Sequence, residues 1–166
     1  MRIVARILTL TVLHRLDPVR KASVLLFLYE SGLIEKDKSI IDLTGADLNG
    51  ANLKMAYLSG ADLSRTILSG AELFQADLQE ADLSRASLSG ASFVEASLRG
   101  ATLLGTMLAG TSLKRADLSE TDLRGADLGG ADFSEANLRG AKVTDEHLKE
   151  AESLKGATMP DGSIHP

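Results

Sequence analysis

Residues 41–90 read IDLTG ADLNG ANLKM AYLSG ADLSR TILSG AELFQ ADLQE ADLSR ASLSG, ten successive pentapeptides in one register. The register continues without insertion to AKVTD at 141–145, which makes 21 pentapeptides in all. The middle residue of each, here called the centre, is Leu everywhere except at Phe93, Phe133 and Val143. Two positions before each centre, residues 46 to 141 hold sixteen Ala and four Thr. A repeat this regular decides the fold of the chain.

The five-residue period excludes an ordinary helix or strand. On an α-helix, successive centres would scatter around all faces, because five residues do not complete a whole number of turns. On a continuous strand they would alternate between the two faces, because five is odd. The pattern buries one side only if the chain turns a corner every five residues. Within one repeat, Ala–Asp–Leu then points in, out and in, and the next two residues form the turn.

The residue two positions after each centre indicates the number of sides in one coil. Steps of twenty collect Gly50, Gly70, Gly90, Gly110 and Gly130, whereas steps of fifteen give no uniform column. The sequence therefore predicts an all-β solenoid with four sides and about five coils. At roughly 4.8 Å per coil, its length is about 25 Å. The predicted core includes the centres Leu48, Leu68, Leu88, Phe93, Leu98 and Phe133.

The tandem A(D/N)LXX pattern over residues 41–145 resembles the pentapeptide-repeat family. The resemblance implies a right-handed quadrilateral β-helix, and both the handedness and the turn types rest on it alone. KASVLLFLYESGLI at 21–34 and HLKEAESLKGATMPDGS at 147–163 are similar to the flanks of cyanobacterial members. The chain resembles gyrase-protecting members only in the repeat, because no loop insertion interrupts its register.

The two ends differ in composition from the repeats and predict caps. We expect an N-terminal helical cap over 1–40, the β-helix over 41–145, and a capping helix with a loose tail over 146–166. A first helix with a wide apolar face is indicated by Ile3, Val4, Ile7, Leu8, Val12 and Leu13. Asp17-Pro18 is typical of a helix start, and Gly32 of a stop, so a second helix should cover about 18–31. Its Leu25, Phe27 and Leu28, with Leu33, are expected to cover the first coil.

Two alternatives to a purely structural cap stay open for the first helix. Its apolar surface could form a homodimer interface. Arg2, Arg6 and Arg15 beside that surface could instead favour contact with a membrane surface, without stable insertion, because no run of 18 apolar residues occurs.

The composition excludes several kinds of chemistry. With no Cys and three widely separated His, we expect no thiolate or histidine metal site, and no cofactor. Asp42, Asp62, Asp82 and Asp122 fall in one column, but Asp before a turn usually bonds nearby backbone, so no catalytic residues are expected. A net charge of −5 argues against nucleic acid as a partner. The chain is therefore predicted to be a non-enzymatic, cytoplasmic protein.

The predicted function is an interaction module that presents flat faces to a protein partner. Phe74 and Val94 lie twenty residues apart at an outward position, and Lys54 and Lys114 flank them in the same column. These four residues are the candidate protein contact, unless the column only stabilises neighbouring coils. The alternative function is a DNA-mimicking binder of DNA gyrase. Residues 41–145 carry fifteen Asp/Glu against nine Lys/Arg, so basic side chains interrupt the acidic ones.

Overall fold

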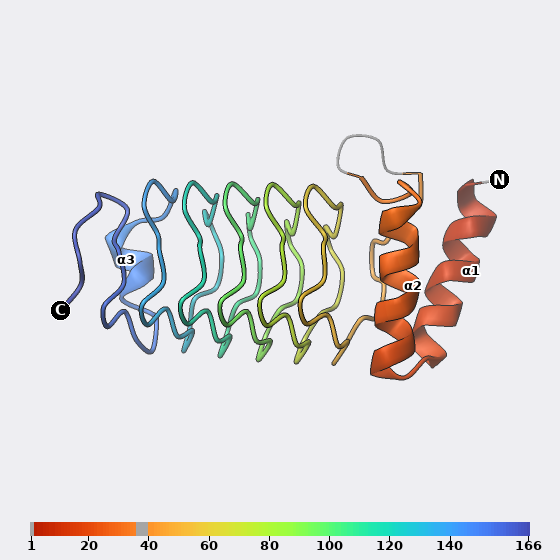
Figure 1. Cartoon of the computed structure of the whole chain (residues 1–166), viewed down its shortest axis with the longest axis horizontal. Helices are drawn as coiled ribbons and strands as arrows, with labels where there is room; N and C mark the ends of the chain where they lie inside the picture. The colour runs from red at the N-terminus through yellow and green to blue at the C-terminus, as the bar shows by residue number, and fades with distance from the viewer. Residues whose placement is uncertain (1, 36–39) are drawn as a thin grey trace.

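The molecule is a rod of stacked coils with two helices at one end (Figure 1). The computed structural model describes residues 2–35 and 40–166, and the side chains of residues 7–35 and 40–166. Helix α1 covers Arg2–Arg15 and α2 covers Pro18–Glu30, while the short α3 covers Asp145–Leu148 near the other end. Between α2 and α3 the described chain forms single-residue β-bridges joined by turns.

Each coil is twenty residues long, as the glycine column predicted. Parallel bridges join residues twenty apart along the rod, from Asp47 and Ile67 through to Asp122 and Lys142. The corner after each centre is closed by a hydrogen bond within the coil, for example from Ala51 N to Leu48 O at 3.0 Å. Most remaining backbone groups pair with the coil above or below, such as Leu48 N with Ile67 O at 2.7 Å. Four pentapeptides per coil therefore give four sides.

The interior consists of the centres and the small residues before them. All centres from Leu43 to Leu138 are buried, and those named in the predicted core are fully inaccessible. Val143 is only partly buried. The inward threonines are buried with their hydroxyls satisfied, since Thr66 donates to Leu63 O at 2.7 Å and Thr111 to Leu88 O at 2.9 Å. Only a small side chain fits beside the leucines, and any polar group it carries must be hydrogen-bonded. Ala has no polar group and the Thr hydroxyls are bonded, which explains why these two residue types share the position.

The second residue after a centre adopts a left-handed backbone conformation at nearly every corner. Glycines occupy many of these positions, but nine non-glycine residues adopt it as well, including Arg65, Glu80 and Arg115 with φ of 55–57°. Such a conformation costs an L-residue roughly 1–2 kcal/mol. The corner is therefore maintained by the packing and hydrogen bonds of the coil, and glycine is not needed to form it.

Helix α2 lies across the first coil and is joined to it by polar contacts. Asp17 caps the helix by accepting a hydrogen bond from Arg20 N at 2.9 Å. Buried Lys21 donates to Asp47 Oδ1 at 2.9 Å, and Tyr29 donates to Ser59 O at 2.9 Å. The desolvation of Tyr29 raises the pKa of its phenol, and the nearby carboxylate of Asp77 raises it further.

One residue predicted to cover the first coil lies elsewhere. Leu25 and Leu28 are buried in the continuous core and Leu33 packs against it, but the side chain of Phe27 is 63% exposed. Two residues advance about 200° around a helix, so Phe27 points away from the face that holds Leu25. The prediction for Phe27 was therefore wrong.

Beyond residue 145 the chain continues along the rod instead of ending in a loose tail. Thr144 caps α3 by accepting from His147 N at 3.3 Å, and Leu148 is buried. Ser153 and Thr158 then pair in parallel with Asp132 and Asn137, a spacing of twenty-one residues that reflects a one-residue insertion. A turn at 160–162 brings Ile164 back to pair antiparallel with Thr158. The prediction of a loose tail was wrong because these residues find backbone partners.

Candidate functional site

The aspartate columns serve the turns. Each Asp or Asn before a centre accepts a hydrogen bond, at 2.8–3.4 Å, from the backbone N–H two residues later. This geometry is shared by Asp42, Asp47, Asn52, Asp62, Asp77, Asp82, Asp117, Asp122, Asp127, Asp132 and Asn137. Within the described residues, no cluster of three His, Cys, Asp or Glu could hold a metal ion. The carboxylates therefore have a structural role at the corners that follow them.

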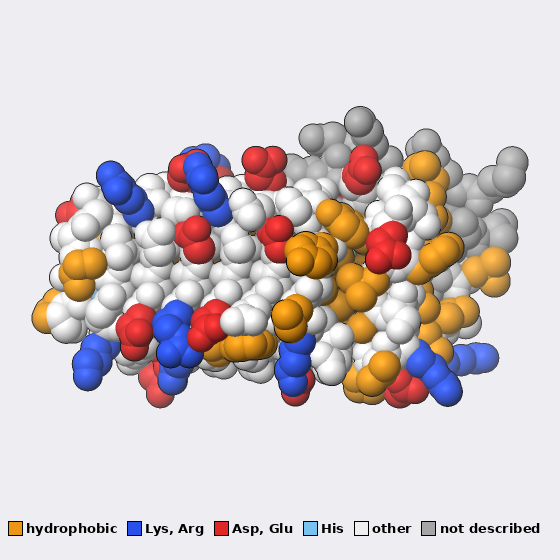
Figure 2. All heavy atoms as spheres, viewed as in Figure 1, with side chains coloured by type: hydrophobic (Ala, Val, Ile, Leu, Met, Phe, Trp, Pro, Cys, Tyr) orange, Lys and Arg blue, Asp and Glu red, His pale blue; other side chains and the backbone are white. Residues whose placement is uncertain are grey.

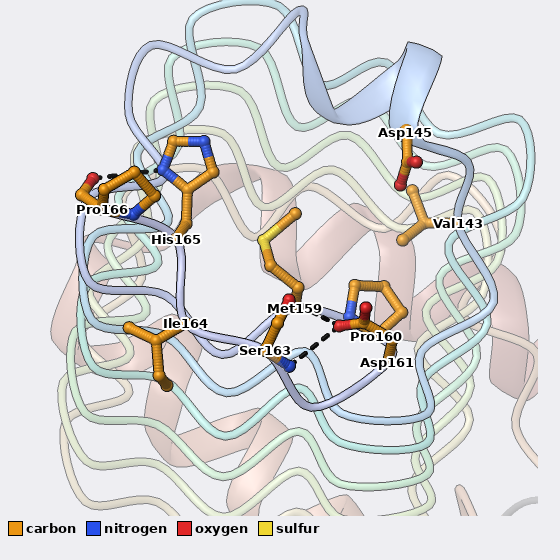
Figure 3. A pocket seen from close by; sticks show the side chains of 9 residues that line it. All are labelled: Val143, Asp145, Met159, Pro160, Asp161, Ser163, Ile164, His165 and Pro166. Carbon is orange, nitrogen blue, oxygen red and sulfur yellow. Dashed lines mark hydrogen bonds between the residues drawn. The ribbon is translucent and has the colours of Figure 1, made fainter.

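A cleft of about 410 Å³ lies at the C-terminal end of the rod (Figure 3). Met159 points into it, and Ser163 donates to Asp161 from both its N–H and its hydroxyl, at 2.8 and 2.6 Å. The hydrogen bonds from Ser163 lower the pKa of the Asp161 carboxyl. The His165 ring contacts Pro166 O at 3.3 Å. The Ser163 hydroxyl is therefore engaged with the Asp161 carboxylate, and the ring with the C-terminal residue.

A row of charged side chains runs along one edge of the rod. Arg115 Nη2 lies 2.6 Å from Glu95 Oε1, and Gln75 Nε2 donates to Glu95 Oε2 at 2.8 Å, so three successive coils are linked. Figure 2 shows rows of acidic and basic side chains along the face in view. Exposed ion pairs of this kind contribute little to stability individually.

On another side, a groove of about 540 Å³ holds carboxylates and guanidinium groups together. Asp62, Asp82, Arg65 and Arg85 are among its lining residues. Further along the same side, Arg124 donates to both carboxylate oxygens of Asp122, at 2.8 and 2.6 Å. This guanidinium lowers the pKa of the Asp122 carboxyl. Mixed charge along this side leaves no extended acidic surface.

The four candidate contact residues do form one column along the rod. Met55 N bonds Phe74 O at 2.8 Å and Gln75 N bonds Val94 O at 3.0 Å, which places positions 54, 74, 94 and 114 on successive coils. Phe74 and Val94 are half-buried rather than fully exposed. Lys54 pairs with Glu72, and Lys114 Nζ lies 2.9 Å from Asp132 Oδ2. Both lysines are thus partly neutralised at the two ends of the apolar pair.

Phe74 and Val94 border a larger surface of mainly uncharged side chains, which we call the neutral band. The exposed Glu72 lies within its outline and pairs with Lys54. Its adjoining side carries Ile67, Ser87 and Met107 in one outward column, and Ile67 and Met107 are exposed. Ser69 and Ser87 hydroxyls lie 2.9 Å apart, so polar groups there are paired. The neutral band consists of Ile67, Ser69, Gly70, Phe74, Ser87, Ser89, Gly90, Ser92, Val94, Met107, Ala109, Gly110 and Ser112.

The corner inside the neutral band is formed by glycine alone. A Cβ added at Gly70, Gly90 or Gly110 would meet no atom within 4 Å. The next corner adopts the same backbone conformation with Gln75, Glu95 and Arg115 in place of glycine. Neither the backbone nor crowding therefore requires this column to be glycine, and the result is a ridge without side chains.

The sequence-based candidate contact, with Phe74 and Val94 as its apolar pair, includes only a small part of the neutral band. A different signal marks it in the sequence, since residues 86–94 and 100–113 contain no charged residue. These are the two longest charge-free runs between 41 and 145. Charge-free runs on stacked coils locate the surface because positions twenty residues apart are neighbours.

Four-sided coils with a leucine interior and uninterrupted outward columns define a repeat solenoid. Residues 41–79, 76–115 and 111–145 match the model of pentapeptide repeats. The chain belongs to the pentapeptide repeat family, and its solenoid is a right-handed quadrilateral β-helix. Proteins of this kind are built from structural repeats and are generally not enzymes.

Solved structures with similar chains include three from cyanobacteria, which confirms the expected resemblance. HetL, a pentapeptide repeat protein involved in heterocyst differentiation regulation from Nostoc sp. strain PCC 7120, is 40% identical over 72% of this chain and 64% of its own, with a TM-score of 0.35. Rfr23 from Cyanothece 51142 is 32% identical over 65% of this chain and 66% of its own, with a TM-score of 0.36. The protein alr5209 from Nostoc PCC 7120 is 27% identical over 82% of this chain and 98% of its own, with a TM-score of 0.46. The chain thus spans less than two thirds of the HetL and Rfr23 structures. No curated protein matched the sequence.

Proposed function

We propose that the protein is a non-enzymatic interaction module that binds a protein partner through the neutral band. The observation that carries this proposal is the scarcity of charge on one continuous surface, where Glu72 is the exception, of a chain that is 25% charged. The centres of protein interfaces are depleted in charged residues and contain apolar anchors. Phe74, Val94, Ile67 and Met107 supply such anchors, and Lys54 and Lys114 lie at the rim.

The glycine ridge supports a flat partner surface. With no side chains at Gly70, Gly90 and Gly110, a partner can approach the backbone of three coils. A standard interface buries roughly 800 Å² on each partner, so both sides of the ridge would have to take part. Phe74 and Val94 on one side and Ile67 and Met107 on the other then act together.

We also propose that the rod is a stable support closed at both ends. It has about five coils over 41–145, with 1–40 as the N-terminal cap and 146–166 closing the other end. The buried core, which runs without a break from Leu13 and Leu25 to Leu148, supports this organisation. Closing the ends protects the terminal coils from pairing with other chains.

Changing Phe74 and Val94 together to serine should abolish partner binding while costing about 1–2 kcal/mol of stability, because both side chains are only half-buried. The matched control is Tyr57→Ser with Leu104→Ser, which removes two exposed apolar side chains from the other two sides. Affinity capture from the native cell extract, with thermal melting of each variant, measures both effects. If the same partners bind the Phe74/Val94 variant as bind the control, the neutral band is not the docking surface.

The alternative function, a DNA-mimicking binder of DNA gyrase, requires a continuous acidic surface. Here Arg124 neutralises Asp122, and Arg99 Nη2 lies 3.2 Å from Glu120 Oε1. Addition of the protein to a gyrase supercoiling assay is therefore expected to leave the rate of supercoiling unchanged. Dose-dependent inhibition or protection from a quinolone would favour the alternative instead.

A further inference from the structure

The outward face of α1 is apolar and largely exposed in the described chain. Leu13 is completely buried, whereas Ile7, Leu8 and Val12, about 100–140° away around the helix, are 46–61% exposed. Helices that are apolar on both faces are normally buried on both. Ile3 and Val4, which the sequence places in the same apolar set, have side chains outside the described part. On the neighbouring helix, Val19 and Phe27 are also exposed.

Charge is segregated along the rod. Helix α1 carries Arg2, Arg6, His14 and Arg15 and not one acidic residue. Residues 1–40 have a net charge of +3, while residues 41–166 have a net charge of −8. Figure 2 shows hydrophobic side chains gathered over the helical end, with Lys and Arg at its lower edge. The apolar surface and the positive charge therefore share one end of the molecule.

We propose that the outer face of α1, with Val19 and Phe27 of α2, docks on an anionic lipid surface. Apolar side chains beside basic ones, on a helix that itself carries no acid, are the features that bind an interfacial helix to anionic headgroups. A second copy of the chain fits less well, because pairing two α1 helices would bring two sets of arginines together and neither helix supplies an acidic partner. No described helix is long and apolar enough to cross a bilayer, so the contact is peripheral.

The position of the helices gives this contact a direction. Helix α1 is the outermost element at one end of the rod (Figure 1), so docking would stand the rod on its helical end. The acidic solenoid would be repelled by the same headgroups that attract the arginines. The neutral band then faces the surrounding solution, away from the lipid.

Co-flotation of the full chain with vesicles tests the proposal. We expect binding to phosphatidylcholine vesicles containing phosphatidylglycerol to be at least about tenfold stronger than to phosphatidylcholine alone, and to weaken as salt rises. Ile7→Ser with Leu8→Ser and Val12→Ser should abolish it, with an unchanged circular dichroism spectrum, since all three side chains are exposed. Arg15→Gln with Arg20→Gln should weaken it. The matched control, Ile67→Ser with Met107→Ser on the solenoid, should bind as the unmodified chain does.

Three results would overturn the proposal. They are the absence of binding to either vesicle, equal binding to both, and loss of binding in the Ile67/Met107 control. Analytical sedimentation of the protein without vesicles measures its oligomeric state, for the unmodified chain and for the Ile7/Leu8/Val12 variant. A dimer that the Ile7/Leu8/Val12 variant converts to a monomer would assign this face to a second copy and exclude lipid as its occupant.

Discussion

Leu88→Asp is expected to unfold the solenoid. Leu88 is fully buried in the middle of the rod, between Leu68 and Leu108 of the neighbouring coils. Loss of a buried leucine costs about 2–5 kcal/mol, and an unpaired buried carboxylate adds several more. The sum is comparable with the whole stability of a domain, which is about 5–15 kcal/mol. Circular dichroism and thermal melting measure the loss.

Ser87→Asp is the control for this experiment. Residue 87 lies next to Leu88 and points outward, at the position where Asp47 and Asp127 occur in the same column. An aspartate there can accept a hydrogen bond from the turn, so we expect a change below about 1 kcal/mol. A Leu88→Asp variant that melts near the unmodified chain would contradict the inward assignment of the centres.

Deleting residues 1–40 is expected to cause aggregation or end-to-end association. Buried Leu25, Leu28 and Ile34 would be lost from the core, and burial of each contributes roughly 1.5–3 kcal/mol. Asp62 N would also lose its hydrogen bond to Ile34 O, which is 2.6 Å long. Open coil edges with free backbone groups are templates for pairing between chains.

Size-exclusion chromatography with light scattering measures the association. A chain beginning at residue 17 keeps α2 and serves as the control, which should stay monodisperse with a lowered Tm. A shortened chain without residues 1–40 that is equally monodisperse and stable would show that the helices are an independent appendage.

The repeat region could be predicted from the sequence because one short period carries all of its information. The inward position of Leu88, the twenty-residue coil and the stacking of Phe74 on Val94 follow from register alone. Phe27 could not be placed correctly, because an apolar residue on a short helix does not reveal which face it occupies. The paired C-terminal residues were missed because one inserted residue shifts Ser153 and Thr158 out of the twenty-residue spacing.

The candidate surface was only partly predictable. Phe74 and Val94 attract notice as large apolar residues at outward positions. Ser89 and Gly110 do not, since serine and glycine are ordinary turn residues at any corner. Their significance depends on charge being absent from neighbouring coils together, which is a property of the assembled surface.

The hydrogen bonds that join one coil to the next run along the rod, and this direction determines how the molecule responds to force. When the two ends are pulled apart, the same load acts on the bonds between every pair of coils, and a coil at an end has another coil on one side only. Each coil that separates releases twenty residues, or roughly 65–70 Å of extended chain. A rod attached at its helical end and pulled by a partner would therefore lengthen in discrete steps, with the remaining coils still folded.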